Sequence, residues 1–143
     1  MAQQRKLRSI PAQQQVFLAF DFGEKRTGVA VGNRLTQGAK VLPTLRVATT
    51  VQRFAAIERV LQEWQPNAIV VGIPFHPDGA AHEMTLRAKR FARQLHGRFA
   101  LPVHEVDERY SSAEAASRGA KDLDGEAAAI ILEQFFSEMD IHE

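Results

Sequence analysis

The chain has 143 residues, a net charge of +1, 45% apolar residues and 24% charged residues, which fits one globular domain with a hydrophobic core. It contains no cysteine, which excludes disulfides, thiolate zinc sites and a cysteine nucleophile. No apolar run reaches the roughly 20 residues that span a bilayer, and the N-terminus lacks the apolar segment of a secretory signal. We therefore expect a cytoplasmic protein without membrane contact.

Residues 1–15 form a Gln-rich segment that has no hydrophobic periodicity and carries three basic residues. We predict a disordered basic leader here, and we expect deletion of residues 1–14 to leave folding intact. Its charge suits either nucleic-acid binding or a simple solubilising extension. A folded domain is predicted over residues 16–140, because no linker or repeat divides them.

The first part of the domain predicts a three-stranded antiparallel meander. Residues 16–22 and 27–32 are apolar runs joined by a short charged turn, which is typical of a β-hairpin. Residues 40–47 predict a third strand, in which Pro43 indicates an edge position or a bulge.

Helical periodicity then replaces the strand pattern. Apolar residues recur at helical spacing over 51–64, with Thr49 or Thr50 as the expected N-cap and Pro66 as the stop. The run AIVVGI at 68–73 predicts a strand that is buried on both faces.

A second helix is predicted over 84–95, ending near Gly97, and a fifth strand over 101–108. An apolar stripe predicts a last helix that starts near Asp124. The order β-β-β-α-β-α-β-α predicts an α/β fold: a mixed five-stranded sheet with helices on both faces and Asp21 near its middle.

Acidic residues gather where these strands and helices end. They are Asp21 in the first strand, Glu105, Asp107 and Glu108 in the fifth, and Asp122 and Asp124 at the last helix. Carboxylates that converge on one cleft suit Mg²⁺ or Mn²⁺, which prefer oxygen ligands. Two such ions about 3.5–4 Å apart activate water and stabilise the leaving oxygen in phosphodiester hydrolysis.

Each acid also has a simpler explanation. Asp21 precedes a glycine and is typical of a residue that begins a turn. Asp107 suits a solvated loop with a weak ion pair, and Asp124 suits a helix N-cap.

Four segments together resemble the signature blocks of the YqgF/RuvX family, in the same order. They are FDFGEKRTGVAVG, VVGIPFHPDG, DERYSSAEA and DLDGEAAAIILEQFF, which span roughly residues 16–137. The resemblance implies an RNase H-like fold related to Holliday junction resolvases. Members of the family are described as pre-16S rRNA nucleases.

Carried over by position, the resemblance implies that Asp21, Asp107 and Asp124 are the catalytic residues and the ligands of Mg²⁺ or Mn²⁺. The same matching and the basic charges suggest substrate contacts, although the basic residues equally suit simple balancing of the acids. These positions are Lys25, Arg26, Thr27, Arg109, Ser111 and Ser112. The loop between Arg109 and Asp124 is shorter than is usual in the family.

The second predicted helix carries a basic run whose exposed face suits either solvation or contact with an RNA backbone. It consists of Arg87, Lys89, Arg90, Arg93 and Arg98.

The resemblance thus implies a metal-dependent endonuclease that acts on structured RNA in pre-16S rRNA maturation and ribosome biogenesis. A DNA nuclease for four-way junctions and a non-catalytic RNA- or transcription-associated factor are the alternatives. We expect nucleic acid as the partner, with RNA favoured over DNA, and a monomer or weak homodimer.

Overall fold

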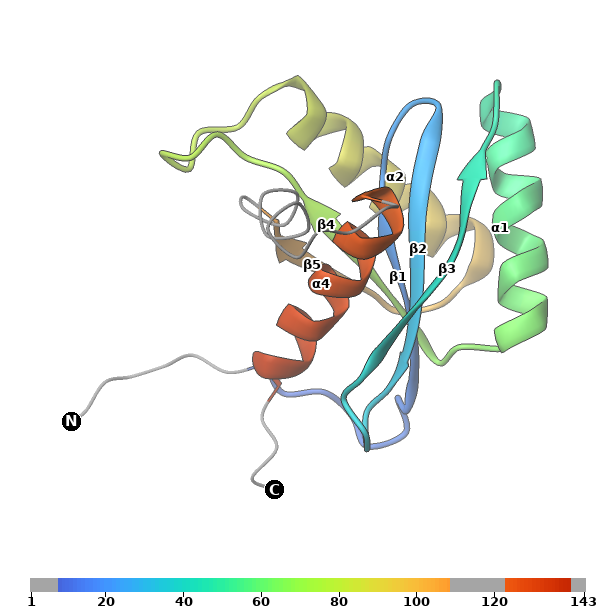
Figure 1. Ribbon diagram of the computed structural model, residues 1–143, viewed down its shortest axis with the longest axis vertical. Coiled ribbons are helices and arrows are strands. Elements are labelled where there is room, and N and C mark those ends of the chain that lie inside the picture. Colours follow the sequence, from blue (N-terminus) through green and yellow to red (C-terminus); the bar gives the residue numbers. More distant parts are fainter. Residues whose placement is uncertain (1–7, 109–122, 140–143) are drawn as a thin grey trace.

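The computed structural model describes residues 8–108 and 123–139, which build one five-stranded sheet with the strand order β3-β2-β1-β4-β5. Helix α4 lies across one face of this sheet, and α1 and α2 cover the other (Figure 1). The strands are β1 (Val16–Asp21), β2 (Arg26–Asn33), β3 (Ala39–Arg46), β4 (Ala68–Ile73) and β5 (Val103–Asp107), and the helices are α1 (Thr50–Trp64), α2 (Glu83–Phe99) and α4 (Leu123–Ser137). The predicted α/β fold with helices on both faces is confirmed.

The sheet is mixed in the predicted way. Strands β1, β2 and β3 pair antiparallel, whereas β4 and β5 run parallel to β1. Parallel neighbours need a crossover connection, which α1 and α2 supply. Pro43 lies in β3, the edge strand, where its missing N–H costs no ladder hydrogen bond.

Alternation along the strands separates two hydrophobic cores. Leu18 and Phe20 of β1 pack with residues of α1 and α2, while Phe17 and Ala19 pack with residues of α4. Successive side chains of a strand point to opposite faces, so Asp21 shares the α4 face with Phe17 and Ala19. The parity of a residue, meaning the face of the sheet to which its side chain points, decides which acidic side chains can meet.

The predicted start and the predicted end of α1 each have a local cause. Thr49 is the N-cap and forms a capping box with Gln52, and Gln65 ends the helix in a left-handed conformation just before Pro66. Helix α2 runs past the predicted end at Gly97, because Ala100 provides its left-handed C-cap.

Part of the predicted leader packs on the domain. Ile10 is 8% exposed and joins the core beneath α4. The Arg8 backbone N–H donates to the Glu138 carbonyl at 2.6 Å, and its guanidinium lies 2.8 Å from the Glu138 carboxylate. Residues 8–15 therefore differ from the expected disordered segment. One buried isoleucine creates no periodicity, so the sequence pattern did not reveal this contact.

Because Arg8 and Ile10 contact the domain, deletion of residues 1–14 should destabilise the protein, contrary to the expectation from the sequence. Ile10→Ala should lower the free energy of unfolding by about 2 kcal/mol, because it removes a buried side chain. Deletion of residues 1–14 should cost at least as much. Thermal and urea unfolding measure both, with the exposed Ser9→Ala as the control. Unchanged stability of the truncated chain would show that these contacts contribute nothing.

Candidate active site

Asp21 is the last residue of β1, and its neighbour across the β1–β2 ladder is Gly28. Gly28 meets the start of α4 through backbone atoms. A Cβ at this glycine would overlap the carbonyl group of Asp124. The missing side chain thus lets the first turn of α4 lie directly on β2, beside Asp21.

Asp124 is the second residue of α4, inside its first turn, so it is not the N-cap that a simpler interpretation of the sequence suggested. Its negative charge acts on the carboxyl group of Asp21 and contributes to raising the pKa of that group. Two of the three predicted catalytic carboxylates are therefore neighbours, although they lie more than 100 residues apart in the sequence.

Glu108 supplies a further carboxyl group to this cluster. It directly follows β5, and its N–H donates to the Ile73 carbonyl at 3.1 Å, which extends the β4–β5 ladder. Two residues beyond the buried Val106, it has the parity of the α4 face. A Cβ on Gly72 of β4 would lie 3.1 Å from Glu108 Cδ, so this glycine provides space for the side chain. The carboxyl groups of Glu108 and Asp21 share a hydrogen bond.

Asp107 has the opposite parity to Glu108. The alternation of β5 assigns it to the α2 face, together with Glu105, which pairs with Lys89 of α2 at 3.0 Å. Asp107 is near enough for its charge to raise the pKa of Glu108, but it is Glu108 that bonds to Asp21. The structure thus brings Asp21 and Asp124 together as predicted, and adds Glu108 where Asp107 was expected.

The carboxyl groups strongly perturb one another. Burial raises the pKa of Asp21 from 3.8 to about 6; the hydrogen bond from Glu108 opposes this shift, and the charge of Asp124 adds to it. Burial also raises the pKa of Glu108 from 4.5 to about 9, with further contributions from Asp21 and Asp107. At neutral pH, Glu108 therefore stays protonated, and its O–H donates a hydrogen bond to the Asp21 carboxylate.

The predicted substrate-binding residues separate into different environments. Arg26 is exposed on the α4 side, with Nε 3.4 Å from Asp124 Oδ2, whereas Lys25 lies in the turn before β2 and lines a cavity beside α1 and α2. Thr27 is 0% exposed and its hydroxyl donates to the Gly23 carbonyl at 3.4 Å. Its side chain offers no surface to a substrate and instead holds the hairpin turn. Three predicted contacts lie outside the described residues: Arg109, Ser111 and Ser112.

The donor set of this cluster suits a hard divalent cation. Carboxylates are the preferred ligands of Mg²⁺ and Mn²⁺. Burial, together with neighbouring carboxyl groups, raises the pKa values of Asp21 and Glu108, so a bound cation would stabilise their ionised forms. In residues 8–108 and 123–139, however, no three His, Asp or Glu side chains are placed closely enough to hold a metal ion. The chemistry of these residues fits a metal ion. Their side-chain positions, however, show one hydrogen-bonded pair, Asp21 and Glu108, with Asp124 beside it.

The fold agrees with that of known resolvases. The crystal structure of the fowlpox virus Holliday junction resolvase superimposes with a TM-score of 0.54 at 12% identity, covering 87% of this chain and 99% of that one. A second fowlpox structure, with Holliday junction DNA, gives 0.53 at 11% identity over 85% and 97%. The strand order and the placement of the helices thus define an RNase H-like fold.

Sequence comparison is more specific. A family model described as "RuvX: Holliday junction resolvase" matches residues 15–138, so the chain belongs to the RuvX family. A protein of Albidiferax ferrireducens is 64% identical over 126 residues, covering 88% of this chain and 80% of the relative. One of Paraburkholderia phytofirmans is 54% identical over 143 residues, covering 94% and 98%. Both are named "Putative pre-16S rRNA nuclease".

Membership of this family assigns the chain to the nucleases, a class of hydrolases, and makes nucleic acid its substrate class. Within the described residues, no helix combines the length and apolar character needed to cross a membrane.

Proposed function

We propose that this protein is a metal-dependent endonuclease that cleaves structured RNA, with pre-16S rRNA in the cytoplasm as its substrate. The observation that carries the proposal is the cluster of Asp21, Glu108 and Asp124, three carboxyl groups from β1, the end of β5 and α4. The names of the relatives support ribosomal RNA as the substrate and a role in ribosome biogenesis.

In this proposal, the side chains of Asp21, Glu108 and Asp124 move closer together to hold Mg²⁺ or Mn²⁺, because their present spacing does not form a metal site, and Asp107 stays outside the ligand set. The bound ion would activate the attacking water and neutralise charge on the phosphoryl group. Arg26, exposed beside Asp124, is placed to hold a phosphate of the substrate. Gly28 and Gly72 fix the positions of the carboxylates by giving them space, and they make no contact with substrate.

Cleavage of DNA four-way junctions is the second candidate. It is favoured by the description of the family model and uses the same carboxylates. A binding factor without catalytic activity is the third, and the intact acidic cluster argues against it.

The test compares a ribosomal RNA precursor with a DNA four-way junction in the presence of Mg²⁺ or Mn²⁺. We expect wild type to cut the RNA, and Asp21→Asn and Asp124→Asn to lose nearly all cleavage because each removes a charge that a hard cation requires. Asp78→Asn, at an exposed position in the loop after β4, should cut normally. Cleavage of the junction alone would support the DNA nuclease, and tight RNA binding without cleavage would support the binding factor.

A further inference from the structure

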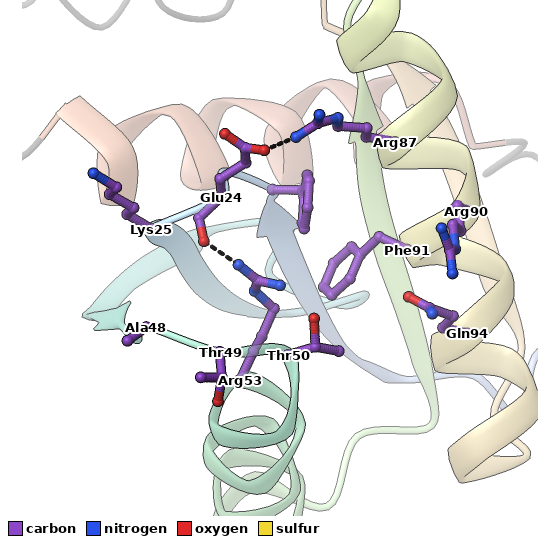
Figure 2. A pocket seen from close by; sticks show the side chains of 11 residues that line it. Glu24, Lys25, Ala48, Thr49, Thr50, Arg53, Arg87, Arg90, Phe91 and Gln94 are labelled. Atoms are coloured by element: carbon purple, nitrogen blue, oxygen red, sulfur yellow. Dashed lines mark hydrogen bonds and ion pairs between the residues drawn. The ribbon is translucent and has the colours of Figure 1, made fainter.

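A cavity of about 570 Å³ lies on the sheet face opposite the carboxyl cluster, the face covered by α1 and α2. The β1–β2 hairpin, the start of α1 and the middle of α2 form its walls, as Figure 2 shows. Its size suits a small ligand or one nucleotide unit. Neither membership of the RuvX family nor the proposed metal site assigns a role to this cavity.

The walls of the cavity are strongly basic. Of the described residues that line it, four carry cationic side chains and one, Glu24, carries an acidic side chain. Glu24 forms an ion pair with Arg87, which also contacts Glu83 at 2.6 Å. The other three cations are Lys25, Arg53 and Arg90. Lys25 and Arg90 are exposed and make no ion pair with a described residue, so the cavity carries an excess of positive charge.

Arg53 is the buried member of this group. It is 7% exposed, and its guanidinium carbon lies 4.9 Å from the centre of the Phe22 ring. Nη2 donates to the carbonyl groups of Gly23, at 3.2 Å, and Glu24. Figure 2 shows Arg53 reaching from α1 to the hairpin. Among the described residues, none accepts a hydrogen bond from its buried Nε, an arrangement that is costly for a buried donor.

The start of α1 adds to the positive electrostatic potential of the cavity. A helix N-terminus carries partial positive charge and free N–H groups, which favour anions. Thr49 caps the helix and lines the cavity together with Thr50. The first turn of α1 contains no acidic residue, so nothing in that turn neutralises the helix end.

We propose that this cavity binds a backbone phosphate of the nucleic acid whose cleavage site lies at Asp21, on the other side of the hairpin. The inference rests on the proposed nuclease function. Asp21 and Phe22 are consecutive residues that face opposite sides of the sheet, and Arg26 and Lys25 divide in the same way. A strand that passes over the tip of the hairpin therefore meets the carboxylates on one side and the cavity on the other.

The first test measures binding, so that it does not depend on catalysis. Fluorescence anisotropy follows the affinity of a labelled RNA oligonucleotide, without divalent metal, over a range of salt concentrations. Lys25→Gln with Arg90→Gln should weaken binding about 10-fold or more and lower the slope of log K against log salt by about 1–2, because two phosphate contacts are lost. Arg93→Gln is the matched control: it is exposed on α2 but does not line the cavity, and it should bind nearly as wild type does.

A second measurement identifies the occupant. The NMR signal of Arg53 Nε–H should shift when the oligonucleotide is added, and should shift little with inorganic phosphate or a free mononucleotide at the same concentration. A shift with the small anions and none with the oligonucleotide would overturn the proposal in favour of a small-molecule site.

Failure of this inference is distinct from failure of the proposed function. Equal RNA affinity and salt slope in wild type and the double variant would overturn the cavity proposal, even if the protein cleaves RNA. Weakened RNA binding in the double variant but not in Arg93→Gln would support the cavity proposal, even if no cleavage is detected.

Discussion

Glu108→Gln should reduce metal-dependent cleavage at least about 100-fold. The substitution keeps the size of the side chain and a hydrogen-bond donor toward Asp21, but the amide cannot lose a proton to become the charged ligand that a bound cation requires. Single-turnover cleavage of the substrate, with circular dichroism to confirm folding, measures this effect.

Asp107→Asn is the matched comparison, because it alters the adjacent carboxylate on the other face of β5. We expect its cleavage rate to stay within about tenfold of wild type, since its charge acts on Glu108 only at a distance. Loss of activity in Asp107→Asn with retention in Glu108→Gln would restore the assignment that the family resemblance implies.

The stability of the metal-free protein should fall as the pH rises from about 5 to 9. The pKa values of Asp21, about 6, and Glu108, about 9, are both raised above those of the unfolded chain. The folded protein therefore binds protons that the unfolded chain has already released. This stabilisation is complete at acidic pH and is lost as the pH passes the folded-state values, by up to about 1.4 kcal/mol per pH unit for each proton.

Urea unfolding at a series of pH values, with a chelator present, measures this dependence. Glu108→Gln should flatten the curve and be more stable than wild type at pH 8, because it removes the titrating group and retains a donor to Asp21. Glu58→Gln, an exposed change on α1, should reproduce the wild-type slope. A wild-type curve that is flat or rises over this range would show that the two carboxyl groups are not buried together.

The fold was predictable because its signals are local. The continuous apolar run Ala68–Ile73, rich in β-branched residues, predicted a strand covered on both faces, and it is the buried strand β4. The helical spacing over 51–64 and the cap at Thr49 likewise depend on neighbours in sequence. Ile10 was missed because its burial depends on α4, which is more than 100 residues away.

The site was predictable in part. Asp21 and Asp124 stand out because each lies at the end or start of a regular element. The choice between Asp107 and Glu108 depends on which face of β5 is covered by α4. Counting by two from the apolar Val106 would have favoured Glu108, but only once Val106 was known to face α4. The Nε of Arg53, which has no partner within residues 8–108 and 123–139, has no sequence signal at all.

The contact between Gly28 and the backbone of Asp124 determines how the third carboxylate is held in place. Two main chains touch there, so the separation of β2 and α4 is set by the thickness of the peptide backbone and not by the fit of any side chain. A bulkier residue at position 28 has no rotamer that relieves the overlap. The position of Asp124 over β2 therefore requires glycine at residue 28, because any side chain there would overlap the backbone of α4.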